Sequence, residues 1–363
     1  MKLRHRFFVM MVLFPALLLA QTAATAPKKQ SPAHTASAGS YPVMSAAAQA
    51  RARQLFGYFE SGQSGQLFAA FSAPMKKNET PAKVATMAKD VGEHLGREQK
   101  MLGENFAPDL MSKNTVYARY SQFTKSKDPV FTVVMVDELG QISMIQPRVT
   151  PPASGNKYDD YKVKTKLDLP FTGEWFVYQG GRSVYQNADA YRDAERYSMV
   201  FTVLKDGQPS SGDGSKNEQF YCYGQPVTAP ADGTVVMIND SYADNVPGRP
   251  EQIMPAGNRV LISHGNQEYS LLMHLKQNSI QVKSGTKVKQ GDIVAECGNS
   301  GNSPAPHLEY RLQNSKGAPY PWTLPPQFVS YVADGKPVTE GEPVRGQFVR
   351  NSTEPASAAA EKK

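Results

Sequence analysis

Turn-forming residues interrupt the chain every few positions from Leu167 to Gly346, and no long helical pattern lies between them. Gly, Pro, Asn and Asp separate short runs that are rich in β-branched and aromatic residues, a pattern typical of successive strands. One such hairpin is expected around Gly265-Asn-Gln267, between the runs 259–264 and 268–274. The pattern predicts an all-β domain over residues 167–346, built as a β-sandwich or an open antiparallel sheet.

The first half of the chain has a different period. Residues 45–59 carry apolar side chains at helical spacing, and Thr80-Pro81 opens a second helix whose apolar residues recur every three or four positions. Three β-rich runs follow at 114–124, 130–137 and 141–146, and the last two flank the turn Glu138-Leu-Gly140. This order predicts an α+β domain over residues 44–149, with helices first and then a curved, cone-like strand meander. It is similar to nuclear-transport-factor-two-like domains, which implies a binding or spacing role.

The two ends of the chain and the segment between the domains have the composition of non-core segments. Basic residues 1–6, an apolar run from Phe7 to Ala20 and the small residues of Ala24-Thr-Ala26 predict a signal peptide over residues 1–26. Residues 27–43 are read as a flexible tether, 150–166 as a linker and 347–363 as a disordered tail. A secreted or periplasmic protein is therefore expected, with no stable membrane span after signal cleavage.

Charge and cysteine content limit the partners. The formal net charge of +7 favours anionic partners such as wall polymers. Basic residues do not cluster with aromatic ones, so a nucleic-acid partner is not expected. The only two cysteines are Cys222 and Cys297, and the sequence leaves open whether they form a disulfide or remain separate buried thiols.

A series of short motifs in the second domain resembles the LytM/lysostaphin-type zinc metallopeptidases, which cleave peptide cross-links in peptidoglycan. Each motif alone is common in β proteins, but their order along about 170 residues is specific. Upstream, residues 175–181, Asn187 and Arg196-Tyr197 fit the opening strands of the same family. The motifs that carry the resemblance are Ala229-Pro-Ala-Asp-Gly233, Ser263-His-Gly-Asn266, Met273-His-Leu275, Gly285 with Gly291-Asp292, Gly298-Asn-Ser-Gly301-Asn-Ser303 and Pro306-His-Leu-Glu309.

The resemblance implies one Zn²⁺ held by two histidines and one aspartate, with a fourth position left for water. The first histidine is expected after Asn187, where the chain has Ala188 and then Asp189. The aspartate position holds Val200, and the second histidine of a His-x-His strand is replaced by Glu309. The two further family histidines, a base and a stabiliser of the tetrahedral intermediate, are retained at the two positions His274 and His307.

These replacements favour a catalytically degenerate protein, without a cofactor, that binds peptidoglycan or regulates a wall hydrolase. Its groove is expected to include Asn187, His274, His307, Glu309 and Tyr310. The alternative is an active zinc endopeptidase with variant ligands, in which Glu309, His307 and His274, together with Asp189, hold the metal. A structural spacer, in which only the first domain binds, is a third possibility.

Overall fold

The computed structural model describes residues 45–150, 157–317 and 321–352. The predicted signal peptide and tether lie outside the described residues. So does residue 44, the first residue of the predicted α+β domain. The same holds for most of the predicted tail. Within the described parts, no helix has both the length and the apolar character that crossing a membrane requires.

Residues 45–150 form helices followed by a sheet, as the sequence predicts. The first helix is capped by Ser45, whose hydroxyl accepts a hydrogen bond from the amide of Ala48. The last helix is capped by Thr80 and has Pro81 at its first position, where no amide hydrogen is needed. The helices described in this part are α1 (Ala46–Glu60), α2 (Ser64–Ala69), α3 (Ala73–Asn78) and α4 (Pro81–His94).

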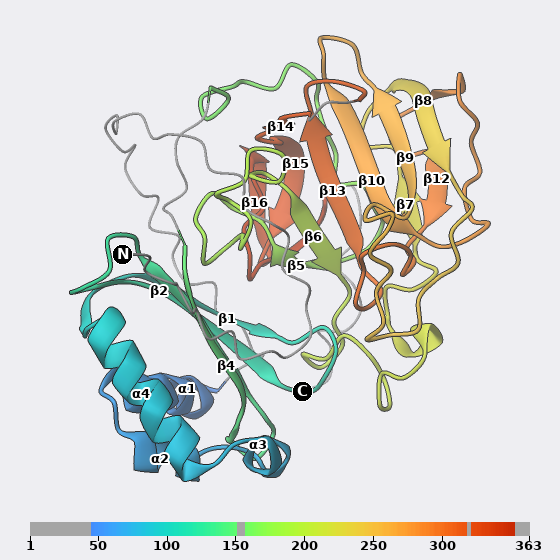
Figure 1. The fold of residues 1–363 in the computed structure, drawn as a ribbon. Coiled ribbons are helices and arrows are strands. Elements are labelled where there is room, and N and C mark those ends of the chain that lie inside the picture. Colours follow the sequence, from blue (N-terminus) through green and yellow to red (C-terminus); the bar gives the residue numbers. More distant parts are fainter. Residues whose placement is uncertain (1–44, 151–156, 318–320, 353–363) are drawn as a thin grey trace, which may run out of the picture. The chain divides into compact units, whose positions relative to one another are not determined.

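The sheet of this part is an antiparallel meander whose helices share a core with one of its faces (Figure 1). Asp137 closes the turn between the strands Val130–Val136 and Ile142–Val149 by accepting the amide hydrogens of Leu139 and Gln141. The first strand was not predicted, because two bulges break its alternation. The α+β order is thus observed, whereas the cone and the resemblance to nuclear-transport-factor-two-like domains stay predictions. The strands are β1 (Glu98–Pro108), β2 (Thr115–Phe123), β3 (Val130–Val136) and β4 (Ile142–Val149).

Residues 157–352 form a predominantly antiparallel β domain, as predicted for this region. A small second sheet pairs β7 (Pro226–Thr228) with β12 (Ile293–Glu296), and a short 3₁₀ helix, η1, covers Asn217–Gln219. In spatial order, the strands described in the large sheet are β11 (Lys287–Val288), β8 (Gly233–Asn239), β9 (Asn258–Ser263), β10 (Tyr269–Leu275), β13 (Leu308–Gln313), β6 (Met199–Thr202), β5 (Trp175–Gln179), β17 (Phe348–Asn351), β15 (Phe328–Ala333) and β16 (Lys336–Gly341), with β14 (Thr323–Leu324) paired to β13.

Two predicted boundaries of this domain are corrected. The predicted tail begins too early, because β17 lies inside residues 347–363 and pairs with both β5 and β15. The predicted linker is partly a fixed piece of the domain. The carboxylate of Glu268, fully buried, accepts hydrogen bonds from the Tyr161 hydroxyl, the Lys164 amide and both the amide and hydroxyl of Thr165. Four donors on one carboxylate hold residues 161–165 on the sheet.

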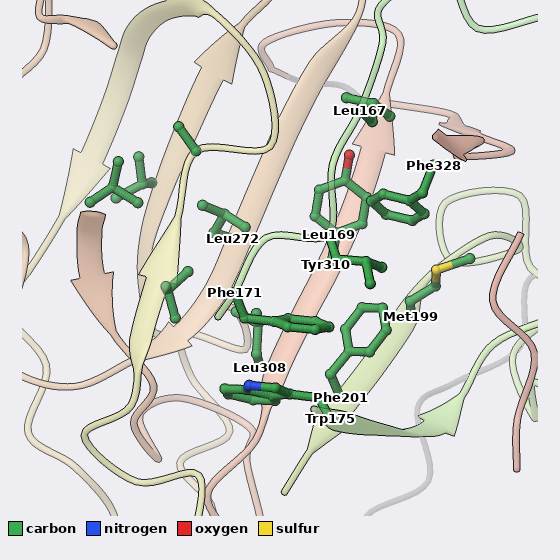
Figure 2. Close-up of a cluster of buried hydrophobic side chains, with 14 of the residues drawn as sticks. Leu167, Leu169, Phe171, Trp175, Met199, Phe201, Leu272, Leu308, Tyr310 and Phe328 are labelled. Carbon is green, nitrogen blue, oxygen red and sulfur yellow. The ribbon is translucent and has the colours of Figure 1, made fainter. Parts of the chain in front are cut away.

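One face of the large sheet packs against the aromatic core shown in Figure 2. Phe171 stacks on Trp175 with ring centroids 4.8 Å apart and meets Phe201 edge to face. Leu308 and Tyr310 of β13 enter this core, and both are fully buried. Because side chains alternate along a strand, the residues between and beside them must point to the opposite face. That opposite face of β13 carries the candidate site.

Gly298 lies where two segments of the site approach each other. Its backbone bridges His307, and a Cβ added to it would lie 2.2 Å from the Lys276 backbone nitrogen and 2.3 Å from the Lys276 Cα. The segment that follows His274 therefore packs directly on Gly298, and only glycine leaves room for it.

We expect Gly298→Ala to lower the free energy of unfolding of the β domain by about 1–3 kcal/mol, because the clash is with backbone that cannot rotate away. Urea unfolding followed by tryptophan fluorescence measures this, since Trp175 and Trp322 are the only tryptophans of the chain. Gly317→Ala is the matched control: nothing lies within 4 Å of its Cβ, and a change below about 0.5 kcal/mol is expected. Equal stability of the two variants would contradict the close approach.

Candidate functional site

The candidate site lies at the beginning of β13, on the face turned away from the aromatic core. His307 precedes the strand, and Glu309 and Arg311 follow at alternate positions. The neighbouring strands supply Val200, which lies directly opposite Glu309 on β6, and His274 from β10. Sheet pairing thus brings together residues that are more than 100 positions apart in the sequence.

His274 reaches the site through a break in β10. The β9–β10 register shifts between Leu272 and Leu275, and His274 adopts a left-handed backbone with φ 61°. A non-glycine residue in this region costs on the order of 1–2 kcal/mol. The bulge lets both Leu272 and Leu275 stay in the core while His274 turns toward β13.

Both ring nitrogens of His274 are in hydrogen bonds. Nδ1 lies 2.8 Å from the Ser300 carbonyl oxygen, and Nε2 lies 3.0 Å from Oε2 of Glu309. A carbonyl oxygen only accepts, so Nδ1 carries a hydrogen. Several neighbours, above all Arg311 and His274, hold the pKa of Glu309 well below its usual range despite its burial, so this carboxylate is ionised and also only accepts. Both ring nitrogens of His274 therefore face acceptors of the protein.

His307 is the neutral partner of this pair. Its ring centroid lies 4.7 Å from that of His274. Burial is the main cause that lowers the pKa of His307, to about 4, and the neighbouring His274 lowers it further. Nδ1 donates to the Ala305 carbonyl oxygen at 2.8 Å, which leaves the lone pair on Nε2. Among the described residues, no hydrogen bond is recorded at this Nε2.

The carboxylate of Glu309 is held by donors on both oxygens, and its side chain is 14% exposed. Oε2 accepts from His274, and Oε1 accepts from the Ser198 hydroxyl at 2.5 Å and from Arg311 Nε at 2.8 Å. Arg311 Nη2 lies 2.7 Å from the same Oε1. Both oxygens of the Glu309 carboxylate thus accept hydrogen bonds from donors of the protein.

Arg311 connects Glu309 to a second acidic residue. Its guanidinium lies 3.6 Å from Oε1 of Glu195, which also pairs with Arg192 at 2.8 Å. Burial raises the pKa of the Glu195 carboxyl above its usual value, although the two arginines act in the opposite direction. Arg311 therefore supplies a positive charge to two carboxylates, those of Glu309 and Glu195.

The residues of the predicted site are only partly brought together. His274, His307 and Glu309 form the one group of potential metal ligands found in the described residues, with ligand atoms all within 4.8 Å of one another. Asp189 is not a member of this group, and its carboxylate lies 3.2 Å from Arg192 instead. Val200, which holds the position expected for the aspartate ligand, lies opposite Glu309. Its side chain is a hydrocarbon and cannot bind a metal.

Two predicted groove residues do not line a groove. Tyr310 points into the aromatic core, where its hydroxyl lies 3.0 Å from that of Ser270, because it alternates with Glu309 on β13. Asn187 is fully buried, and its amide donates to the carbonyl oxygens of Glu195, Arg196 and Ser198. Asn187 thus shapes the loop after Ala188 instead of contacting a ligand.

Sequence reasoning missed Ser198 and Arg311, the two residues that pair with Glu309 on Oε1. The spacing of Arg311 contained a signal, since residues 307, 309 and 311 share one face of a strand. An arginine two positions from a buried glutamate on that face is a natural ion-pair partner. The contribution of Ser198 depends on the pairing of β6 with β13, which no local pattern indicates.

We expect the pKa of His307 to make the β domain less stable in acid. The unfolded histidine takes up a proton near pH 6.5, whereas the native one stays neutral down to about pH 4. Stability is therefore greatest above pH 6.5 and falls by about 3 kcal/mol as the pH drops to 4. His307→Gln should flatten this part of the curve of unfolding free energy against pH, measured by tryptophan fluorescence in urea. An unchanged slope would contradict the buried neutral state.

We expect Arg311→Met to destabilise the domain by about 2–4 kcal/mol, because it leaves the Glu309 carboxylate buried beside Val200 without its main counter-charge. The double variant Arg311→Met with Glu309→Leu removes both charges and should recover much of the loss. Urea unfolding of the two variants and the wild type measures the coupling. Equal losses in the single and double variants would show that the pair does not act as a unit.

Known proteins resemble the segment that holds this site. Residues 218–321 match the family model described as Peptidase family M23. An uncharacterized metalloprotease of Haemophilus influenzae is 38% identical over 101 residues, which cover 28% of this chain and 18% of that protein. The peptidoglycan DD-endopeptidase ShyA of Vibrio cholerae is 39% identical over 90 residues, 24% of this chain and 17% of that protein. The chain thus spans less than a fifth of the length of these relatives.

Solved structures give a weaker likeness. A zinc-containing peptidase from Vibrio cholerae is 15% identical with a TM-score of 0.28, covering 73% of this chain and 64% of that one. The catalytic domain of lysostaphin from Staphylococcus simulans is 20% identical with a TM-score of 0.23, covering 44% and 88%. At these scores the similarities carry no argument about the site. The match to the family model and the two relatives confirm the resemblance drawn from the motifs: residues 218–321 match peptidase family M23.

Proposed function

We propose that this protein is an exported, catalytically degenerate member of its peptidase family that binds peptidoglycan or regulates a wall hydrolase. The observation that carries the proposal is the state of Glu309. Its two carboxylate oxygens are held by Ser198, Arg311 and His274, where a peptidase of this family would place a metal ligand. The predicted signal peptide supports export.

The chemistry of the donor set does not fit a resident zinc ion. Ala188 and Val200 offer no lone pair, so two of the three expected ligands are absent. A cation at Glu309 would have to displace the Arg311 guanidinium and the contact with His274 Nε2, and it would then lie beside the positive charge of Arg311. Without a metal to lower the pKa of a bound water, the site generates no strong nucleophile at neutral pH.

Binding without cleavage agrees with what remains of the site. The fold and the two histidines persist although the ligand positions are lost, and the chain has a net charge of +7, which favours anionic wall polymers. The relative from Vibrio cholerae is described as a peptidoglycan endopeptidase, so the same polymer is the first partner to test. We assign the α+β domain a binding or spacing role.

An active zinc endopeptidase is the second candidate, and one observation favours it. The ligand atoms of His274, His307 and Glu309 lie within 4.8 Å of one another, and a set of two histidines and one glutamate suits catalytic zinc. The lone pair of His307 Nε2 is available to a metal. This candidate requires His274 Nε2 and Arg311 to give up their contacts with Glu309 when zinc binds.

One experiment separates the two candidates. The mature chain is incubated with Zn²⁺, exchanged into metal-free buffer and mixed with purified peptidoglycan at about 0.3 M salt, where weak surface electrostatics are screened. We expect a zinc content near zero, retention on the peptidoglycan and no release of soluble muropeptides. Glu309→Ala, checked for folding by tryptophan fluorescence, is the matched variant.

The opposite results identify the alternative. A zinc content near one per chain, with muropeptide release that a chelator or Glu309→Ala abolishes, would establish the peptidase and overturn the proposal. The proposal also allows that the protein regulates a wall hydrolase without binding peptidoglycan itself. If peptidoglycan does not retain the chain, this form of the proposal predicts that the chain changes the rate at which an added wall endopeptidase releases muropeptides. Absence of zinc, of retention and of any effect on an added hydrolase would contradict both forms of the proposal.

A further inference from the structure

The two cysteines of the chain lie together beneath the candidate site. Cys222 and Cys297 are each fully buried, and both belong to the aromatic core cluster of the β domain. They are 75 positions apart in the sequence, and the chain has no other cysteine. Both are free thiols in the structure, and, apart from the effect of burial, their mutual interaction lowers the pKa of Cys222 and raises that of Cys297.

Backbone pairing holds the two residues in place. Glu296 of β12 is opposite Pro226 of β7, and one position further Cys297 exchanges both backbone hydrogen bonds with residues 224 and 225, at 2.8 and 2.9 Å. Gln225 donates in turn to the Cys222 carbonyl oxygen at 3.0 Å. This turn places Cys222 beside Cys297 independently of any contact between the sulfur atoms.

The same residues contact both histidine segments. Leu275, next to His274, bridges Cys297, and Gly298 bridges His307. The Cys222 thiol donates to the carbonyl oxygen of Pro306, the neighbour of His307, at 3.0 Å. A covalent bond between the cysteines would therefore tie together the segments from which His274 and His307 extend.

We propose that Cys222 and Cys297 form a disulfide that staples the floor of the site in the mature protein. The inference depends on export, as in the proposed function, because an oxidising compartment is where such bonds persist. It does not depend on whether the site binds peptidoglycan or zinc.

The oxidation is a thiol–disulfide exchange with a protein or small-molecule disulfide. The thiolate of one cysteine attacks the oxidant, releases one of its sulfurs as a thiol and forms a mixed disulfide. The second cysteine, as its thiolate, then displaces the other sulfur, so that two thiols of the chain are oxidised and one disulfide of the oxidant is reduced to two thiols. Because both cysteines are inaccessible in the folded domain, the exchange takes place while the domain folds.

The test is refolding of the full mature chain from denaturant in a mixture of reduced and oxidised glutathione, followed by denaturation, alkylation and mass spectrometry. We expect no alkylated cysteine and a mass about 2 Da below that of the dithiol, corresponding to the loss of two hydrogens. The melting temperature should exceed that of the reduced chain by about 5–10 °C, since the bond closes a long loop.

Cys222→Ser and Cys297→Ser are the matched variants, and each should retain one alkylatable thiol and the lower melting temperature. Two alkylated cysteines, separate glutathione adducts or a disulfide-linked dimer in the wild type would each overturn the proposal. These outcomes are read from thiols and mass, so they are distinct from failure of the zinc and peptidoglycan tests.

Discussion

The buried carboxylate of Glu309 is the group on which the arrangement of the site depends. An ionised carboxylate that is mostly removed from water is stable only when its oxygens meet donors and its charge meets a counter-charge. Here Ser198, His274 and Arg311 supply both, each from a different part of the chain. Replacing any one of these residues changes the electrostatic environment of the others, so the cluster is a single electrostatic unit.

In the proposed function, this unit takes the place of the metal ion that the motif resemblance implies. A divalent cation joins ligands from separate strands by its charge, and in this chain the hydrogen bonds of Glu309 with Arg311 and His274 join the strands instead. The proposed change of function thus needs no change of fold. The aromatic core on the other face of β13 is untouched by it, because Leu308 and Tyr310 alternate with the residues of the site.

The backbone at His274 shows that the site is nevertheless imposed by the fold. A left-handed histidine in a strand is unfavourable by itself and persists because the surrounding sheet, Ser300 and Glu309 hold it. Gly298 leaves room for the segment that follows His274, and Cys297 bridges Leu275, the residue after His274. The conformation of one residue is therefore supported by contacts from β9, β13 and the turn after β12.

The sequence by itself determined that helices precede a sheet in the first part, although β1 was missed, and it determined the β character of the second domain and the resemblance to the family that residues 218–321 match. Turn residues and alternation are local, and the capping of α1 and α4 by Ser45 and Thr80 is local as well. It also identified His274, His307 and Glu309 as a group, because their motifs occur in a recognisable order.

Only the tertiary structure decided what these residues do to one another. Arg311 and Ser198 at Glu309, the separation of Asp189 from the site, the core position of Tyr310 and the proximity of Cys222 to Cys297 all depend on which strands pair and in what register. A shift of one residue turns every side chain of a strand to the other face, and no local pattern carries that information. The charge balance of the site therefore follows from packing between segments distant in the sequence.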